Sequence, residues 1–254
     1  MQLNILDIRG VVPKTCRPIL TGVLPVTTGL GISAEDTLSI HDPFLNPVDD
    51  QGQTGTCEAR SACGVVETLI REYVNPNAFQ GGKQLDATYW HREAFKLEYP
   101  GREYSDREGL PLGATFRAMK SKGMLPYEAQ LVSVSPNYAS MRPALVKAPL
   151  QIGVNLHNGW RADRVNRETG EIPVDVITGV AGHGVKVVSL NAGRGGLAYW
   201  GIENSWGEGW AWHGIGQIEH DHLIKVLLDD PILLTFDYTW LRYNQEWRGY
   251  VVTV

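Results

Sequence analysis

The sequence predicts an α+β protein whose first part is mainly helical and whose second part is rich in strands. Residues 41–150 contain segments in which apolar residues recur every three or four positions, as on one face of an α-helix. Residues 151–254 contain short runs of β-branched and aromatic residues separated by glycine-rich loops, which is typical of strands. A chain of 254 residues is long enough to bury a substantial core in two packed halves.

Residues 1–40 match neither pattern and are predicted to form an N-terminal extension. The segments 4–12 and 18–28 look extended, and three prolines exclude long helices. Such a segment covers part of its own protein, adds a strand to a partner, or is a simple structural extension. The sequence leaves these three alternatives open.

A cysteine stands at the start of the helical part, where a loop meets a helix. The loop before Cys57 contains Gly52 and Gly55, which allow sharp turns, and the helix is predicted to run from about Cys57 to Val74. The unpaired N–H groups and the macrodipole at a helix N-terminus lower the pKa of a thiol there and make it more reactive. Taken alone, a cysteine at a helix start is more often a buried structural residue than a nucleophile.

The remaining elements follow from the same patterns. Helices are predicted over residues 85–99 and 114–123, with a loop rich in charge and glycine between them. The predicted strands cover residues 151–156, 185–190, 197–204, 215–220 and 247–254. The acidic and histidine residues from Glu219 to His222 alternate along a strand end, and no second ligand group accompanies them. No metal site is therefore predicted.

Two of these strands, residues 185–190 and 197–204, are predicted to pair as a hairpin around the glycine-rich loop 191–196. If this hairpin is symmetric, His183 faces Asn204 across it, with Cβ atoms about 5 Å apart. The amide oxygen then lies beside one imidazole nitrogen and leaves the other free to meet a thiol. Cys57, His183 and Asn204 thus have the chemistry of a nucleophile, a base and an orienting group.

Three motifs, in this order, resemble the papain family of cysteine peptidases, and the similarity covers residues 41–254. The matching positions are Gln51, Gly55, Cys57, Ala59 and Ser61 around the nucleophile; His183, Gly184 and Val185 around the base; and Asn204, Ser205, Trp206, Gly207, Gly209 and Trp210, with Gly214 downstream.

The resemblance implies a papain-like fold, in which a helical half packs on an antiparallel β-barrel-like half with the active-site cleft between them. It implies a Cys57–His183–Asn204 triad that hydrolyses amide bonds through a thioester. The side chain of Gln51 and the backbone N–H of Cys57 would donate to the oxyanion, and Trp206 would cover the His183–Asn204 contact. No cofactor is implied.

Several positions depart from the family. Glu108 and Gly109 stand where the family has a glycine pair lining one wall of the cleft, so that wall would carry a negative charge. Next to the nucleophile, Glu58 and Arg60 replace aromatic residues. A carboxylate beside Cys57 opposes the thiolate and Arg60 favours it, or both charges face a partner segment such as the N-terminal extension.

Composition excludes other classes of function. The net charge is -5 with no basic cluster, which argues against nucleic-acid binding, and no transmembrane span or secretory signal is predicted. The three cysteines, Cys16, Cys57 and Cys63, do not reproduce the disulfides of secreted family members, so we expect synthesis in a reducing, cytoplasmic compartment. The extension is too short and too irregular for the usual propeptide, which favours a prokaryotic or viral type.

We therefore expect a papain-like endopeptidase or related amide hydrolase acting on polypeptide, with a peptidoglycan or isopeptide bond as a subsidiary substrate. The alternative is a papain-like module that serves as a structural or binding part of a larger assembly, such as a viral particle, with weak or no activity. In that case the N-terminal extension would contact the partner protein.

Overall fold

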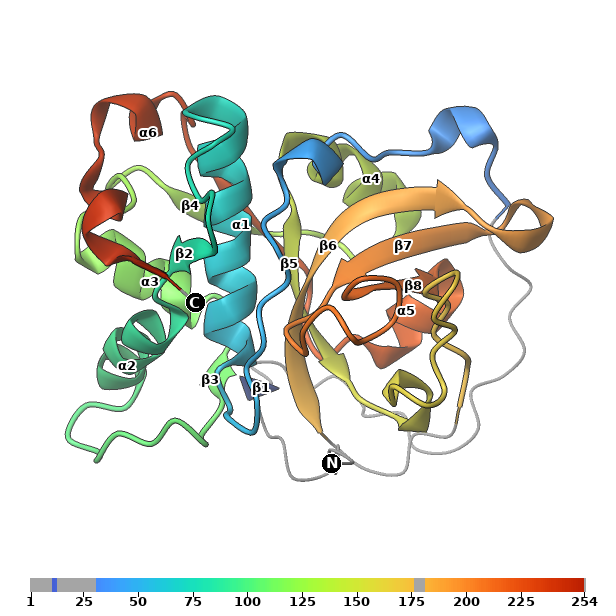
Figure 1. Ribbon diagram of the computed structural model, residues 1–254, viewed down its shortest axis with the longest axis horizontal. Helices are drawn as coiled ribbons and strands as arrows, with labels where there is room; N and C mark the ends of the chain where they lie inside the picture. Colours follow the sequence, from blue (N-terminus) through green and yellow to red (C-terminus); the bar gives the residue numbers. More distant parts are fainter. Residues whose placement is uncertain (1–10, 13–30, 176–180, 254) are drawn as a thin grey trace.

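The computed structural model describes residues 11–12, 31–175 and 181–253. A mainly helical half and a half built on one large sheet lie side by side, with α1 at their junction (Figure 1). The α+β class predicted from the sequence is therefore confirmed. In the described residues the helices are α1 (Cys57–Tyr73), α2 (Ala87–Glu98), α3 (Ala114–Ser121), α4 (Tyr138–Lys147), α5 (His220–Val226) and α6 (Trp240–Tyr243). None of these helices is both long enough and apolar enough to cross a bilayer.

The large sheet has six antiparallel strands in the order β4-β9-β5-β6-β7-β8. Their bounds are β4 (Gln130–Ser133), β5 (Leu150–Asn155), β6 (Gly182–Ala192), β7 (Ala198–Glu203), β8 (Ile215–Glu219) and β9 (Ile232–Thr235). Every residue of β5 is buried, as are the first nine of β6, because these two central strands are covered on both faces. Two small pairs complete the structure: β1 (Val11–Val12) with β3 (Leu110–Pro111), and β2 (Lys83–Leu85) with β10 (Val251–Thr253).

Helix α1 connects the two halves because almost its whole circumference is buried. Thirteen of its seventeen residues are buried, including a central stripe of Val66, Leu69 and Ile70. Its other side lies against β6, where Gly64 leaves room for the Lys186 side chain: a Cβ at Gly64 would lie 2.7 Å from the Lys186 ammonium nitrogen. Lys186 is itself buried and forms a 2.9 Å ion pair with Glu203 of β7.

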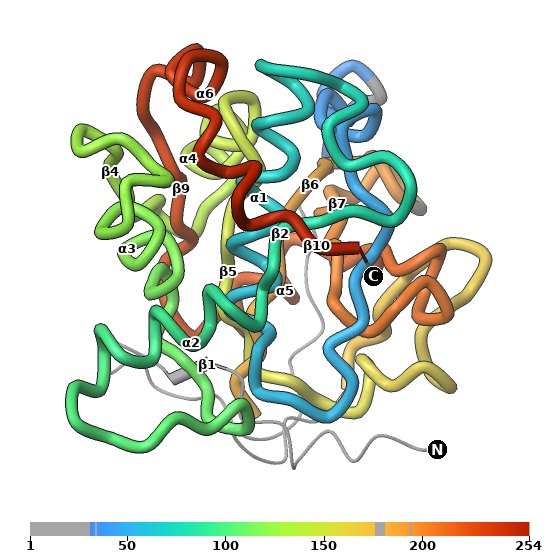
Figure 2. Tube along the Cα trace, turned by 60° about the vertical axis from the view of Figure 1, so that its left-hand side comes forward, coloured from blue at the N-terminus to red at the C-terminus, as the bar shows by residue number. Residues whose placement is uncertain are grey.

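The C-terminal strand differs from the sequence interpretation. β10 forms within the predicted segment 247–254, but it pairs with β2 in the helical half and not with the large sheet. The chain crosses back after β9, and Figure 2 shows α6 and β10 lying over the helical half beside α1 and β2. Ring contacts such as that between Trp90 and Tyr250, 4.6 Å between centroids, hold this return segment in place.

The hairpin register also differs from the symmetric one. Ala192 pairs with Ala198, and an irregularity between Val187 and Ser189 moves the pairing one residue back toward the symmetric register. The cause is the turn, where Gly195 and Gly196 both adopt positive φ and close a tight connection beyond Ala192. The ladder between β6 and β7 ends at Lys186 and Glu203, so His183 does not pair with Asn204; its backbone partner is Val154, on the other side of β6.

Within the segment 219–222 only Glu219 belongs to a strand, as the last residue of β8, and α5 begins at His220. The Glu219 side chain caps α5 by accepting hydrogen bonds from the backbone N–H groups of Asp221 and His222, each at 3.2 Å. Within the ranges described, no three His, Cys, Asp or Glu side chains gather as metal ligands would.

Part of the N-terminal extension lies on its own protein. Ile32 donates a backbone hydrogen bond to Gly196, and Leu38 exchanges two with Leu190 of β6. Backbone pairing in parallel also joins β1 to β3. The rest of the predicted extended segments, together with Cys16, lies outside the described residues.

Candidate active site

Cys57 is the first residue of α1 and has no solvent-exposed surface. The loop before it is fixed by two backbone hydrogen bonds, from Gln51 to Ser205 at 2.8 Å and from Gly55 to Asp106 at 2.6 Å. The Cys57 Sγ accepts a hydrogen bond of 3.2 Å from the backbone N–H of Gly184 on β6. The thiol thus lies at the interface where the start of α1 meets the strand that carries His183.

The imidazole of His183 is held between an amide and an indole. Its Nε2 lies 2.6 Å from Oδ1 of Asn204, which also accepts from the backbone N–H of Ser205 at 2.8 Å. Because that oxygen is an acceptor, the proton of a neutral His183 is on Nε2, and Nδ1 is the basic nitrogen. Trp206 stacks on the ring, with centroids 4.8 Å apart and planes at 27°. The pairing of His183 with Asn204 is thus made by side chains despite the shifted strand register.

The thiol and the imidazole do not touch through a hydrogen bond. Among the described residues, His183 Nδ1 has no partner although it is buried. Burial raises the pKa of Cys57 to about 12, with a smaller contribution from the nearby Glu58 carboxylate, while the Gly184 N–H acts in the opposite direction. Burial lowers the pKa of His183 to about 4, against the opposing effect of Asn204. In this closed arrangement both groups are neutral at pH 7.

The side chain of Gln51 is buried beside these residues and is engaged with its own loop. Its Nε2 donates to the backbone carbonyl of Thr54 at 2.7 Å, and its Oε1 accepts from the hydroxyl of Ser205. One N–H of the amide therefore remains for another acceptor. The bridge between Asp50 and Trp206 brings this loop and the Asn-Ser-Trp segment together.

The predicted cleft wall carries less net charge than the sequence suggested. Both carboxylate oxygens of Glu108 accept from Arg102, at 2.6 and 2.8 Å, so the negative charge is paired within the wall. The backbone carbonyl of Gly109 lies 3.5 Å from the hydroxyl of Tyr99. A Cβ at Gly55 would lie 2.8 Å from the carbonyl oxygen of Arg107, so this wall contacts the loop that precedes Cys57.

Three comparisons relate the chain to known proteins. No family model matches it. It is 25% identical over 226 residues to a cysteine proteinase of Theileria annulata, covering 79% of this chain and 46% of that protein. It is 27% identical over 195 residues to the senescence-specific cysteine protease SAG39 of rice (Oryza sativa subsp. indica), covering 70% of this chain and 55% of the relative.

Solved structures agree in fold. The digestive procathepsin L 3 of Tenebrio molitor superposes with a TM-score of 0.58 at 17% identity, covering 91% of this chain and 78% of that one. The proform of the ragweed pollen cysteine protease Amb a 11 gives a TM-score of 0.56 at 15% identity, covering 81% and 66%. The chain has a papain-like fold. It spans about half the length of the curated relatives it matches.

One feature of the site was not found from the sequence. Glu58, beside the thiol, is fully buried and accepts from the backbone N–H and the hydroxyl of Thr115, at 3.3 and 2.6 Å, and from Gln151 Nε2 at 3.1 Å. Thr115 lies in the first turn of α3, so the carboxyl group caps that helix. Burial raises the pKa of Glu58, and these hydrogen bonds oppose the rise.

Arg60, the second departure, contacts side chains that lie shortly before it in the chain. It forms an ion pair with Asp49, and its Nε donates to the hydroxyl of Thr56 at 3.1 Å. Of the two charges, only Glu58 contributes to the raised pKa of the Cys57 thiol. The partners of Glu58 and Arg60 could not be identified from the sequence. Thr115 and Gln151 approach Glu58, and Asp49 approaches Arg60, only after the chain folds.

Gly184 permits the close contact between β6 and α1. A Cβ there would lie 2.9 Å from the Cα and 3.0 Å from the N of Glu58, which are backbone atoms that cannot rotate away. We expect Gly184→Ala to displace the thiol from the strand and to lower the free energy of unfolding by about 1–3 kcal/mol. Gly209→Ala is the matched control, because nothing lies within 4 Å of its added Cβ. Denaturant unfolding of both variants measures the difference, and equal stabilities would contradict the assignment.

Proposed function

We propose that the protein is a cysteine peptidase that hydrolyses amide bonds of polypeptides with Cys57 as nucleophile, His183 as general base and Asn204 as the orienting residue. The observation that carries the proposal is the 2.6 Å contact of His183 Nε2 with Asn204 Oδ1. It directs the basic Nδ1 away from the amide, while Gly184, the next residue of the strand, holds the thiol. The names of the curated relatives, all cysteine proteinases or proteases, support the same reaction class.

In the proposed reaction, the Cys57 thiol transfers its proton to His183 Nδ1 as sulfur attacks the carbonyl carbon of the substrate. The tetrahedral oxyanion accepts from the Cys57 backbone N–H and from the second N–H of Gln51 Nε2. His183 then gives its proton to the leaving amine, and the acyl group remains as a thioester. A water molecule, deprotonated by His183, attacks the thioester and releases the acid and the thiol.

The burial of Cys57 and His183 means that the site must open before the reaction can begin. Cys57 and His183 are fully buried and have pKa values near 12 and 4, so the closed site holds a neutral pair. Substrate binding must separate the walls, since access of a peptide to Sγ also brings water and polar groups to both side chains. Hydration moves both pKa values toward each other and allows the proton to pass from sulfur to nitrogen.

The same burial supports a second candidate function, a papain-like module with weak or no activity in a larger assembly. In an inactive module the Cys57 thiol would stay buried, and His183 Nδ1, which has no partner among the described residues, would accept no proton from it. In this proposal the N-terminal extension contributes to the contact with a partner protein, for example in a viral particle. Synthesis in a reducing compartment is proposed for both functions, because Cys57 and Cys63 are free thiols.

Mass spectrometry after treatment of the native protein with a thiol-reactive epoxide distinguishes the peptidase from the inactive module. We expect labelling at Cys57 that His183→Ala abolishes, because the epoxide reacts with an activated thiol.

Cys63 provides an internal control, because it is also a buried thiol on α1 and its pKa is raised well above the ordinary value by burial. Modification of Cys63 at the same rate as Cys57 would indicate local unfolding and not activation. An unlabelled Cys57 in a folded protein would reject the peptidase and favour the module.

A further inference from the structure

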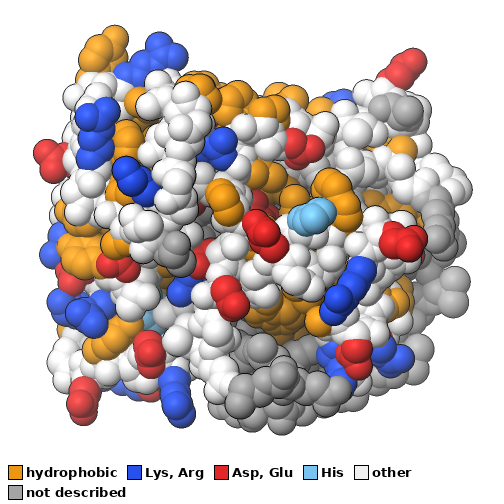
Figure 3. Space-filling view, in the orientation of Figure 1, with side chains coloured by type: hydrophobic (Ala, Val, Ile, Leu, Met, Phe, Trp, Pro, Cys, Tyr) orange, Lys and Arg blue, Asp and Glu red, His pale blue; other side chains and the backbone are white. Residues whose placement is uncertain are grey.

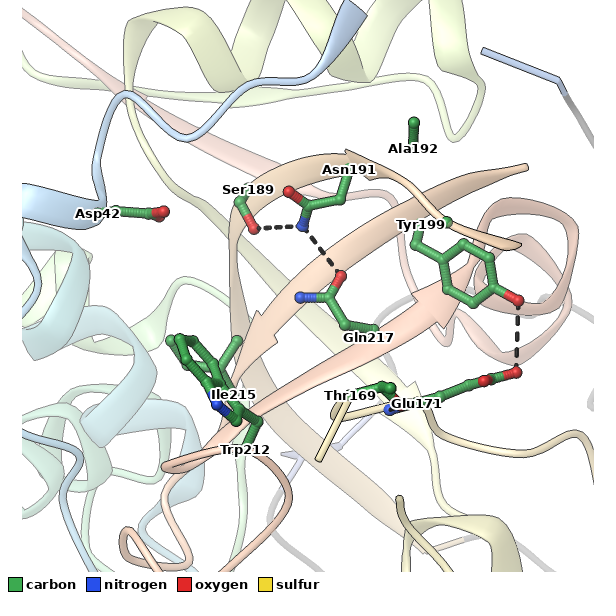
Figure 4. Close-up of a pocket in the computed structure, with 11 residues that line it drawn as sticks. Asp42, Thr169, Glu171, Ser189, Asn191, Ala192, Tyr199, Trp212, Ile215 and Gln217 are labelled. Carbon is green, nitrogen blue, oxygen red and sulfur yellow. Dashed lines mark hydrogen bonds between the residues drawn. The ribbon is translucent and has the colours of Figure 1, made fainter. Parts of the chain in front are cut away.

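The outer face of the large sheet is hollowed around a glycine. Strand pairing places Ser189, Gly201 and Gln217 in one row across β6, β7 and β8, and an isolated bridge adds Glu171 beside Gln217. A Cβ at Gly201 would lie 2.0 Å from the Ser189 hydroxyl, so only glycine leaves this row open. The resulting pocket of about 350 Å³ is shown in Figure 4.

One wall of the pocket is formed by the partly solvent-exposed indole of Trp212. Trp212 is 49% exposed, and the residues on either side of it, Ala211 and His213, both have a φ of 50°, which is unusual for side chains with a Cβ. Such backbone strain persists only where the surrounding structure enforces it. Here the backbone hydrogen bonds between Trp212 and Ile215, at 3.0 and 3.2 Å, close the loop and project the indole over the pocket.

The floor of the pocket contains the side-chain amides of Asn191 and Gln217, which are only partly engaged in hydrogen bonds with each other and with Ser189. Asn191 Nδ2 donates to Ser189 Oγ at 3.1 Å and to Gln217 Oε1 at 3.0 Å, which uses both of its N–H groups. The remaining atoms, Asn191 Oδ1 and Gln217 Nε2, point toward the side of the pocket where Asp42 lies (Figure 4). Because the donor groups of Asn191 are occupied, its oxygen is fixed as a free acceptor.

The charge of the pocket is negative. Asp42 and Glu171 lie toward opposite ends in Figure 4, and no Lys or Arg is among the described residues that line it. No hydrogen bond or ion pair from the described residues reaches the Asp42 carboxylate, and Glu171 accepts only a long hydrogen bond of 3.4 Å from Tyr199. In Figure 3, which has the orientation of Figure 1, this face of the sheet half shows red acidic, blue basic and orange apolar side chains together.

We propose that this pocket binds a primary alkylammonium group. An ammonium ion carries three donors and no acceptor, which matches the Asp42 carboxylate and the fixed Asn191 oxygen at one end of the pocket. The indole of Trp212 would face the cation or its alkyl chain, a contact that favours a positive charge over a neutral isostere. A second ammonium at the far end would meet Glu171, so a diamine uses the whole pocket.

The ligand has two sources with this chemistry, a free diamine and a lysine side chain of a peptide. Neither depends on the proposed peptidase, because none of the residues around Cys57 lines the pocket. Binding is therefore expected to persist in Cys57→Ala, and failure of the labelling experiment would leave this proposal intact.

Isothermal titration calorimetry at low ionic strength tests it with four probes: 1,4-diaminobutane, n-butylamine, N-acetyl-lysine amide and the neutral 1-butanol. We expect saturable binding of the amines and none of the alcohol. Trp212→Ala and Glu171→Gln should each weaken binding of 1,4-diaminobutane by about fivefold. Glu168→Gln, which removes an exposed carboxylate from the same loop outside the pocket, should leave binding unchanged.

The probes also separate the two sources. Binding of N-acetyl-lysine amide as tight as that of n-butylamine supports a lysine side chain, and diamine binding at least about tenfold tighter supports a free diamine. Equal binding of 1-butanol, affinity unchanged in both Trp212→Ala and Glu171→Gln, or no saturable heat with any amine would each overturn the proposal.

Discussion

Replacement of His183 by alanine is expected to lower the rate of peptide hydrolysis by about 1000-fold or more, because the sulfur would lose its proton acceptor and the leaving amine its proton donor. Asn204→Ala should produce a smaller loss, since it removes the acceptor that fixes the imidazole and not the base itself. The measurement is kcat/KM on an unfolded protein substrate between pH 5 and 8, with the thermal midpoint of each variant recorded beside it.

His41 provides the matched control for the loss of a buried imidazole. It is as fully buried as His183 and has two contacts, with Glu72 at 3.2 Å and with the Leu145 carbonyl at 2.6 Å, but it lies away from the thiol. His41→Ala should therefore destabilise the protein without a change in kcat. Equal losses of activity in both variants, or more than a tenth of the activity left in His183→Ala, would contradict the role of His183 as base.

Local patterns predicted α1, α2, α3 and the strands β5 to β8, but they missed α4, α5, α6, β4 and β9, and they failed where distant segments decide the geometry. The start of α1 at Cys57 and the strands around His183 follow from periodicity within a few residues. The hairpin register does not, because it depends on how a glycine-rich turn closes, and glycine allows several closures. Likewise β10 has an evident strand composition, but which sheet it joins is settled by a partner, β2, that lies far away in the sequence.

The same limit applies to the candidate site. Residue types and spacing identified Cys57, His183, Asn204 and Gln51, and the structure brings these residues to one interface between the halves. The pKa values of the thiol and the imidazole could not be predicted from the sequence, because they are set mainly by desolvation in the folded protein. A motif thus specifies which groups meet, while the packing around them decides the charge that they carry.

A second large effect is expected on the stability of the protein in acid. It arises from two buried histidines, His157 and His222, whose contact was not predicted from the sequence. His157 and His222 are buried with their Nε2 atoms 2.8 Å apart. Nδ1 of His157 accepts from the Gly159 backbone N–H at 3.1 Å, so His157 carries its proton on Nε2 and donates to His222. Burial lowers the pKa of His157 to about 4, and burial together with the charge of a protonated His157 lowers that of His222 to about 3.

Because both pKa values are lower in the folded protein than the ordinary value of 6.5, the unfolded chain binds protons that the folded protein rejects. Stability contributed by the neutral pair is therefore present above pH 6.5 and is lost as the pH falls. Between pH 7 and pH 5 each histidine is expected to lower the free energy of unfolding by about 2 kcal/mol. Glu67, whose pKa burial raises to about 7, acts in the opposite direction, so the total must be separated by variants.

His222→Gln makes that separation, because its side-chain oxygen can still accept from His157 while the titration of residue 222 is removed. Relative to wild type, the variant should gain about 2 kcal/mol as the pH falls from 7 to 5, whatever its stability at pH 7. Leu223→Val is the matched control, since it thins the packing at the next residue of α5 and removes no titrating group. Urea unfolding at both pH values measures the difference. Parallel pH profiles for wild type, His222→Gln and Leu223→Val would show that the histidine pair does not govern acid stability.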